Sequence, residues 1–342
     1  MTTRVALYGA GMISMAHGAA AQALGYEVGA VASRTPERAE KVAGVFGARA
    51  VAYADLPGDC DVVAIATPPQ CHADDALRML QAGALVLLEK PLCTTLADAD
   101  RIVDAAARHD GRLLYAENLA YAPVVHQLLA LVPRVGRLTH LEVRSLQGLP
   151  TWGAFTSDEW GGGALFDLGV HPLAIAMLAA NAAGEGRVTG VSATLRGSEQ
   201  HGSDEHAQVR LHFRSGFTAS VTSSWQAGPE PLWDAQVAGE VGVARAELLP
   251  TQLLEFNGDP VPLPVAAAKV AVLEELGYAQ QLRALVDDAA AGREPAMSAV
   301  FGREVLQVVM AGYASAGRQG TTVSLPYAGP RDRTPLQVWR DG

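Results

Sequence analysis

The sequence is poor in cysteine, in aromatic residues and in positive charge, and the shortages of cysteine and of positive charge each argue against a class of protein. Three cysteines (Cys60, Cys71 and Cys93) occur among 342 residues without metal-ligand spacing, so we expect neither a disulfide framework nor a metal site. Aromatic residues make up 6% of the chain, and 36 acidic against 26 basic residues give a net charge of -10. This charge excludes a general binder of nucleic-acid phosphates, although one local basic pocket for a single nucleotide is compatible with it.

Long uncharged apolar runs are missing as well. No apolar stretch of about 18 residues is free of polar and charged side chains, and even the apolar run 164–180 carries Asp167 and His171. Met1-Thr2-Thr3-Arg4 leads straight into a predicted strand, where a secretory leader would have a charged and then an apolar region. We therefore expect a reduced, cytoplasmic protein that acts on neither nucleic acid nor membranes.

The first third of the chain has the pattern of a parallel sheet. Short apolar runs predict strands at Val5–Tyr8, Val28–Ala32, Asp61–Ala66, Ala84–Leu88 and Arg112–Tyr115. Helical stretches separate them, at Ser14–Leu24, Pro36–Phe46, His72–Ala82 and Leu96–Ala107. This βαβ alternation is typical of a doubly wound Rossmann sheet with both faces covered.

The pattern changes after about Asn118. A strand at Leu138–Arg144 and one Ala-rich helix, Ala164–Ala179, precede runs in which polar and apolar residues alternate. These runs are Arg187–Leu195, Gln208–Phe213, Phe217–Ser224, Trp233–Ala238 and Ala244–Leu249. They predict an α+β domain with a large, mostly antiparallel sheet whose second face is open. Helices follow at Val272–Ala290 and Gly302–Ala314, and the tail from Thr321 is expected to wrap the surface. The length predicts two domains. The change of pattern places them at 1–118 and 119–342.

A glycine-rich turn follows the first predicted strand and indicates a nucleotide site. Gly9 allows a tight turn, Gly11 lets the backbone approach a pyrophosphate, and the helix from Met12 and Ile13 directs its N–H groups at that anion. Ser14 stands where the fingerprint usually has its third glycine. A bare G-x-G also fits an ordinary turn, but its place at the first strand-to-helix junction favours the cofactor interpretation.

The end of the second predicted strand bears on the choice of cofactor. NAD enzymes usually carry an acidic residue there for the ribose diol, whereas this chain has Ser33-Arg34-Thr35. Arg34 can pair with a 2′-phosphate, and no carboxylate repels it, so NADP is favoured. NAD stays open, because Arg34 can also stack on adenine.

Two further strand ends are expected at the same edge of the sheet. Thr67 and Pro68 begin a rigid loop that leads to His72, and we expect all three residues to lie near the cofactor. Glu89-Lys90 ends the next strand, which places an ammonium beside a crevice of low dielectric constant. A plain Lys90–Glu89 ion pair is the alternative.

Asp167 and His171 lie four residues apart in an otherwise apolar helix. They would share one helical face, where a carboxylate can fix the imidazole tautomer that a general base needs. A buried structural pair is the alternative.

Together these motifs resemble the family of glucose–fructose oxidoreductase, inositol dehydrogenase and rhizopine-catabolism oxidoreductase (Gfo/Idh/MocA). The matching stretches are Gly9–Ser14, Ala66–His72, Glu89-Lys90-Pro91, Glu117-Asn118, Gly162–His171 and Gly302–Ser324. The resemblance implies a catalytic set of Lys90, Asp167 and His171, a Lys90–Pro91 bond that can be cis, and a homodimer or homotetramer formed through the open sheet. It also implies hydride transfer between nicotinamide and a secondary hydroxyl or ketone of a sugar, sugar derivative or cyclitol.

Several residues complete the expected site. Asn118 would contact the cofactor, Tyr121 would line the nicotinamide end, and Trp152, Trp160 and Trp225 are candidates to stack on a sugar ring. Three alternatives stay open: a glycosidase that oxidises its sugar transiently, an aldose–aldose oxidoreductase that keeps its cofactor, and a nucleotide-sensing regulator. The combination of Lys90, Asp167 and His171 argues against the regulator, because a sensor needs no proton relay.

Overall fold

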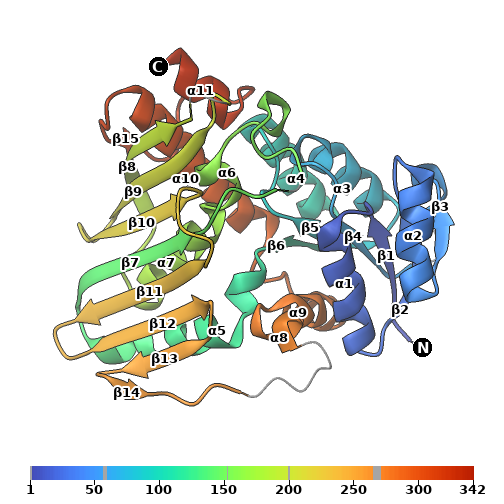
Figure 1. Ribbon diagram of the computed structural model, residues 1–342, viewed down its shortest axis with the longest axis horizontal. Coiled ribbons are helices and arrows are strands. Elements are labelled where there is room, and N and C mark those ends of the chain that lie inside the picture. Colours follow the sequence, from blue (N-terminus) through green and yellow to red (C-terminus); the bar gives the residue numbers. More distant parts are fainter. Residues whose placement is uncertain (1, 57–59, 152, 199–200, 265–270) are drawn as a thin grey trace. The chain divides into compact units, whose positions relative to one another are not determined.

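The computed structural model describes residues 2–56, 60–151, 153–198, 201–264 and 271–342 (Figure 1). Contacts divide these residues into two compact units. The first comprises residues 2–93, 97–122 and 271–303, and the second 94–96, 123–264 and 304–342. The predicted domains were two consecutive segments divided after Asn118. The units differ from them, because residues 271–303 belong to the same unit as the Rossmann sheet.

The first unit contains a six-stranded, wholly parallel sheet in the order β3-β2-β1-β4-β5-β6. Its strands are β1 (Arg4–Tyr8), β2 (Glu27–Ala32), β3 (Arg49–Val51), β4 (Val62–Ile65), β5 (Leu85–Glu89) and β6 (Leu113–Ala116). The helices are α1 (Met12–Ala23), α2 (Pro36–Phe46), α3 (His72–Gln81), α4 (Leu96–Arg108), α8 (Ala271–Glu275) and α9 (Tyr278–Ala290). The strand order reverses between β1 and β4, and ligands of such sheets bind outside the carboxyl ends of the strands at that point.

Apolar runs explain the inner strands of this sheet. Every residue of β4 and β6 is buried, as both faces of a covered parallel sheet require. All five expected strands form, within a residue or two of their predicted ends. The sequence pattern did not indicate β3, whose three residues are exposed or half-buried at the sheet edge.

The second unit contains a nine-stranded sheet in the order β14-β13-β12-β11-β7-β10-β9-β8-β15. Its strands are β7 (Leu138–Leu146), β8 (Val188–Gly197), β9 (Asp204–Phe213), β10 (Thr218–Ser224), β11 (Leu232–Gly239), β12 (Val243–Leu249), β13 (Leu253–Phe256), β14 (Asp259–Pro260) and β15 (Val323–Ser324). Neighbouring strands are antiparallel except for the parallel pair β7 and β10. The predicted combination of a Rossmann sheet and a mostly antiparallel sheet is confirmed.

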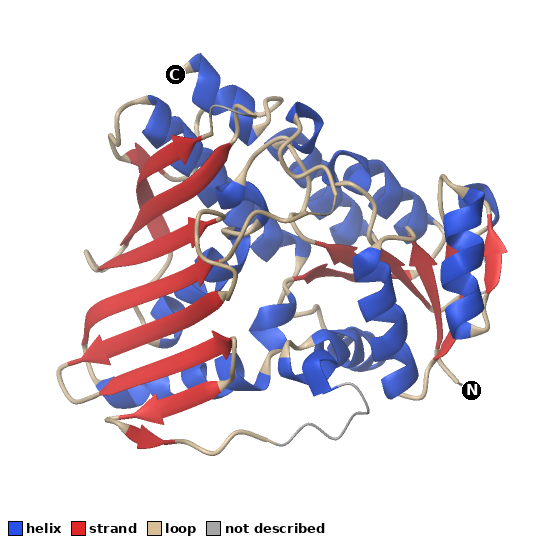
Figure 2. Cartoon of the chain, in the orientation of Figure 1, coloured by secondary structure: helices blue, strands red, loops and turns tan. Residues whose placement is uncertain are grey.

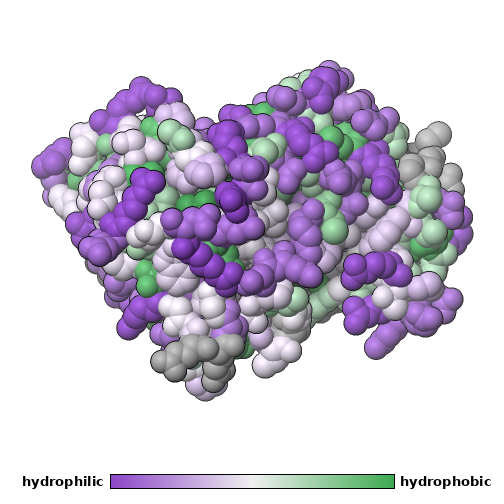
Figure 3. Space-filling model, turned by 90° about the horizontal axis from the view of Figure 1, so that it is seen from above, coloured by the Kyte–Doolittle hydropathy of each residue, from purple (hydrophilic) through white to green (hydrophobic). Residues whose placement is uncertain are grey.

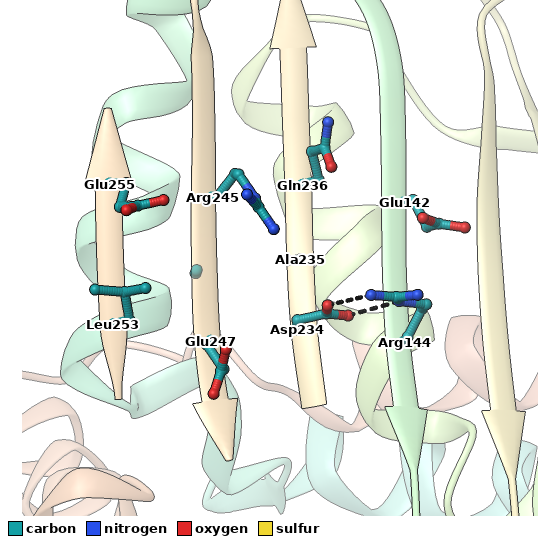
Figure 4. Close-up of a pocket in the computed structure, with 10 residues that line it drawn as sticks. Glu142, Arg144, Asp234, Ala235, Gln236, Arg245, Glu247, Leu253 and Glu255 are labelled. Carbon is teal, nitrogen blue, oxygen red and sulfur yellow. Dashed lines mark hydrogen bonds and ion pairs between the residues drawn. The ribbon is translucent and has the colours of Figure 1, made fainter. Parts of the chain in front are cut away.

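Helices pack on one face of the nine-stranded sheet. The helix α5 (Pro123–Leu131) packs on β12, and α7 (Val170–Ala182) packs on β7 and β10 (Figure 2). The other face carries the alternate, polar residues. Side chains of both charges lie side by side over β7, β11, β12 and β13, and Arg144 Nε donates to Asp234 Oδ1 at 2.9 Å (Figure 4).

Two helices that the sequence predicts as continuous are broken. The expected helix Ala164–Ala179 consists of α6 (Ala164–Asp167) and α7, which are separated by Leu168 and Gly169. The expected helix Val272–Ala290 is divided into α8 and α9 at Gly277, whose φ is +82°. A side chain at Gly277 would meet the Asn118 carbonyl oxygen at 2.1 Å, so this break needs glycine.

The C-terminal part is more regular than its composition indicates. The helix α10 spans Ala299–Gly317, and α11 spans Pro335–Asp341 in the tail expected only to wrap the surface. Thr334 and Gln337 form a capping box at the start of α11, a signal that was present in the sequence.

Hydrophilic side chains cover most of the face drawn in Figure 3. Among the described residues, no single helix has the length and apolar character to cross a membrane, and one bent pair, Asp158–Asp167 with Val170–Ala182, satisfies both criteria only together.

Candidate functional site

The turn between β1 and α1 has the geometry of an anion site. Gly9 has a φ of +120°, and a side chain there would meet the Ala66 carbonyl oxygen at 2.6 Å. Gly11 caps α1 with no side-chain hydrogen bond, and nothing lies within 4 Å of the position its Cβ would take. The first turn of α1 carries no acidic residue, Met12 is 53% exposed, and Ile13 is half-buried. These features leave backbone N–H groups available to a pyrophosphate.

Arg34 is exposed at the end of β2, and Ser33 beside it accepts a hydrogen bond from the Thr35 N–H at 3.2 Å. Tyr53 lies next to Arg34 and stacks on Tyr8 with a centroid separation of 4.3 Å. Burial raises the pKa of Tyr53, and the backbone and charge of Arg34 oppose that shift. The sequence did not single out Tyr53, which follows the short strand β3.

His72 joins the loops that follow β4 and β5. Its Nε2 lies 2.8 Å from the Thr67 carbonyl oxygen, and its Nδ1 lies 3.0 Å from that of Pro91. Burial lowers the pKa of His72, although these carbonyl oxygens favour the charged ring. Thr67 Oγ1 donates to Asp75 at 2.7 Å. His72 is 1% exposed, so its contribution here is to hold the loops of Thr67 and Pro91. The direct cofactor contacts of Thr67, Pro68 and His72 stay predictions.

Glu89, the last residue of β5, holds the backbone of Lys90 in place. One carboxylate oxygen lies 2.8 Å from His17 Nε2 in α1, and the other accepts the Lys90 backbone N–H at 3.1 Å. Burial alone would raise the pKa of Glu89, but His17 and then Lys90 outweigh it and lower the pKa. The Lys90–Pro91 bond is cis, as the resemblance implied. Glu89 therefore braces Lys90, and its direct contact with the cofactor stays a prediction.

Asn118 and Tyr121 lie in the short 3₁₀ helix η3 (Asn118–Tyr121) of the first unit. The Asn118 amide donates to the Leu276 carbonyl oxygen at 2.7 Å, so part of its bonding capacity holds the turn between α8 and α9. Tyr121 is half-buried, and burial raises its pKa to about 12, opposed by the nearby backbone of Met297. The contacts of both residues with ligands stay predictions.

Asp167 and His171 belong to the second unit and flank the break between α6 and α7. Asp167 ends α6, His171 is the second residue of α7, and they are 5% and 4% exposed. The prediction of one continuous helix was wrong, because Leu168 and Gly169 interrupt it, and the pairing of the two side chains stays a prediction. The His171 ring packs on Trp233 of β11, with centroids 5.4 Å apart and planes inclined by 34°.

The tryptophans differ in their surroundings. Trp225 is 3% exposed and forms a core cluster with Ala164 and Leu168, so it is not placed as a ring platform. Trp160 is half-buried and meets Phe155 edge to face at 4.7 Å, which leaves its predicted sugar contact untested. Trp152 lies outside the described residues. Trp233, which the sequence indicated only as the first residue of a predicted strand, contacts the predicted catalytic residue His171.

Comparisons with known proteins agree with this arrangement. Residues 3–117 match the family described as "Oxidoreductase family, NAD-binding Rossmann fold", and residues 132–245 match the "GFO/IDH/MocA C-terminal domain". The chain is 33% identical over 246 residues to a dTDP-3,4-didehydro-2,6-dideoxy-alpha-D-glucose 3-reductase of Saccharopolyspora spinosa, covering 66% of this chain and 69% of that protein. It is 35% identical over 122 residues to the D-glucoside 3-dehydrogenase of Escherichia coli (strain K12), covering 34% and 35% of the two chains.

Solved structures share the fold over nearly the whole chain. GenD2 from gentamicin A biosynthesis, in complex with NAD, has a TM-score of 0.82 at 24% identity and covers 95% of this chain and 96% of its own. A levoglucosan dehydrogenase in complex with NADH and L-sorbose has a TM-score of 0.83 at 20% identity, with coverages of 96% and 100%.

Proposed function

Because this chain belongs to the Gfo/Idh/MocA oxidoreductase family, with an NAD-binding Rossmann fold, we propose that it transfers hydride between a nicotinamide cofactor and a secondary hydroxyl or ketone of a sugar, sugar derivative or cyclitol. The observation that carries the proposal is the open glycine turn at the switch point of a sheet ordered β3-β2-β1-β4-β5-β6. Such a turn suits a dinucleotide, and the family's reaction supplies the chemistry.

The residues present fit the cofactor. Gly9, Gly11 and the first turn of α1, with Met12 and Ile13, would hold the pyrophosphate, and Ser33 and Arg34 would hold the adenosine ribose. We propose NADP in preference to NAD, because Arg34 is exposed and the nearest acidic residue in sequence is Glu37, in α2. The solved structures named above hold NAD or NADH, so this preference rests on Ser33 and Arg34 alone.

In the proposed mechanism three side chains handle the proton and the charge. His171 takes the proton of the substrate hydroxyl during oxidation and returns it during reduction. Asp167 orients the imidazole of His171 and favours its charged form. Lys90 donates a hydrogen bond to the reacting oxygen and stabilises the negative charge that develops there. Nicotinamide, when bound, supplies the hydride or accepts it.

The names of two relatives support a narrower proposal for the substrate. The 3-reductase acts on a nucleotide-linked keto-sugar and the 3-dehydrogenase on a glucoside, and both names place the reaction at carbon 3. We propose a pyranose substrate that reacts at carbon 3, with Trp233, Trp160 and Tyr121 as candidate contacts. A ring that packs on Trp233 would lie beside His171, because the two side chains are already in contact.

We also propose a homodimer or homotetramer formed through the open face of the nine-stranded sheet. Acidic and basic side chains alternate there, including Glu142, Arg144, Asp234 and Arg245, so two copies related by a two-fold axis would present complementary charges (Figure 4). Light scattering tests this assignment: Thr222→Arg, in the centre of the face, should yield monomers, whereas Gln22→Arg, an exposed control in α1, should leave the assembly intact. A wild-type monomer would refute it.

A turnover screen tests the proposed reaction. Purified protein is mixed with NADPH or NADH and 3-keto sugars, or with NADP or NAD and sugars, glycosides, inositols and nucleotide-linked sugars, and nicotinamide absorbance is followed. Turnover that is lost in Lys90→Ala and His171→Ala supports the proposal. Glycoside cleavage without net cofactor turnover would identify the glycosidase, and nucleotide binding without any chemistry would identify the regulator.

A further inference from the structure

A buried carboxylate and a buried phenol meet beside the segment that carries Asp167 and His171. Asp204 is the first residue of β9, and Tyr313 lies in α10; both are 0% exposed. The Tyr313 hydroxyl donates to Asp204 Oδ1 in a short hydrogen bond. All these residues belong to the second unit.

This pair binds the backbone at the start of α6. The Gly163 N–H donates to Asp204 Oδ1 at 3.0 Å and to the Tyr313 hydroxyl oxygen at 2.9 Å. The Leu165 N–H donates to the other oxygen, Asp204 Oδ2, at 2.8 Å. The helix α6 has no capping side chain of its own. Side chains of β9 and α10 therefore accept the hydrogen bonds of two N–H groups at its start.

The fit leaves no room at Gly163. A side chain there would come within 2.5 Å of Asp204 Oδ1 and 2.1 Å of the Asp204 carbonyl oxygen. Burial raises the pKa of Asp204 to about 6, although its hydrogen bonds oppose the shift. A buried carboxylate costs folding free energy unless it is well bonded. Here the Gly163 N–H, the Leu165 N–H and the Tyr313 hydroxyl supply those bonds, so the carboxylate and this backbone hold each other in one arrangement.

The bonded segment leads directly to the proposed catalytic pair. The Asp167 N–H donates to the Gly163 carbonyl oxygen at 3.0 Å, and the Gly169 N–H donates to that of Ala164 at 2.8 Å. With α6 only four residues long, the orientation of Asp167 depends on where Gly163 and Leu165 are fixed. The break that follows then sets where α7 presents His171.

We propose that Asp204 and Tyr313 are positioning residues that fix the segment from Gly163 to His171, and thereby the proton-transferring pair. The inference rests on the proposed function for its catalytic consequence, but the anchor itself is tested without substrate. Neither residue needs to touch the substrate.

The test uses two variants and one matched control. Tyr313→Phe keeps the ring and removes the hydroxyl, and Asp204→Asn turns an amide N–H₂ toward backbone N–H groups that need acceptors. Tyr327→Phe is the control, because Tyr327 is a buried tyrosine of the same unit, 5% exposed, outside this cluster. Hydrogen exchange of peptides spanning residues 161–171 is measured together with kcat, KM and cofactor affinity.

In Tyr313→Phe we expect faster exchange across this segment and a kcat lower by about 10-fold to 10²-fold, because small misplacements of catalytic groups are costly. Asp204→Asn should show the larger effect, and cofactor affinity should not change in either variant. Unchanged exchange in both variants would overturn the anchor, and faster exchange with an unchanged kcat would overturn the positioning role. If the wild type turns over no substrate, the proposed function fails, while exchange still decides whether the anchor exists.

Discussion

Replacing Glu89 with glutamine should destabilise the first unit and leave its fold intact. The carboxylate bonds His17 Nε2 at 2.8 Å and the Lys90 backbone N–H at 3.1 Å, and His17 and Glu89 are 0% and 7% exposed. Glutamine keeps the volume and one oxygen, but it removes the charge that faces His17.

The magnitude follows from burial. A hydrogen bond to a charged group contributes about 1.5–3 kcal/mol, and breaking a buried ion pair costs about 3–5 kcal/mol. Because glutamine can still hydrogen-bond His17 through its amide group, we expect a loss of about 2–3 kcal/mol, near the lower of these values. At about 2–4 °C for each kcal/mol in a unit of this size, the melting temperature should fall by roughly 5–10 °C at pH 7.

The effect should depend on pH in a defined direction. The pKa of Glu89 is lower in the folded state, so its stabilisation is complete above the ordinary carboxyl pKa and is lost as the pH falls through the folded value. The difference between wild type and Glu89→Gln should therefore be constant near neutrality and shrink below about pH 4.3.

Thermal unfolding followed by circular dichroism between pH 3.5 and 8 measures both effects. Glu40→Gln, at an exposed position in α2, is the matched control and should lie within about 0.5 kcal/mol of wild type. A double-mutant cycle with His17→Gln isolates the pair. A loss at pH 7 no larger than in the control, or a difference that grows on acidification, would refute the reasoning.

Three further changes have defined outcomes. Arg34→Ala should weaken NADPH binding by about 10-fold to 10²-fold, the value of a charge-assisted contact with the 2′-phosphate, and NADH binding much less, as measured by cofactor fluorescence; equal losses would contradict the proposed role. His171→Ala should lower kcat by about 10² to 10⁴ with unchanged cofactor affinity, as steady-state kinetics and titration would show; near-normal turnover would exclude His171 as the base. Gly9→Val should abolish cofactor binding and lower the melting temperature, because its side chain would press on the Ala66 carbonyl; retained micromolar affinity would contradict the assignment of the turn.

Local patterns in the sequence predicted most of the fold. The apolar runs of β1, β2, β4, β5 and β6 are continuous and buried, so composition and order identify them. The strand Arg49–Val51 is too short and too exposed to leave such a signal. The break at Leu168 and Gly169 also left little trace, because the mostly apolar residues on both sides favour one continuous helix.

Candidate site residues could be proposed from the sequence where they form one local motif. Contacts between residues far apart in the sequence could not be predicted. The Gly9 turn and the Asp167–His171 spacing are local patterns. The partner of Glu89 lies 72 residues away at His17, and Asp204 lies 41 residues from Gly163. Packing of Trp233 on His171 likewise depends on β11 lying beside β7, which strand patterns alone do not determine.

Calorimetric titration of nucleotide-stripped protein with NADPH and then NADH tests the central claim most directly. We predict micromolar binding of NADPH with one site per chain, and weaker binding of NADH. If neither nucleotide binds, the protein is not a nicotinamide-dependent oxidoreductase, and the Rossmann unit must serve another purpose.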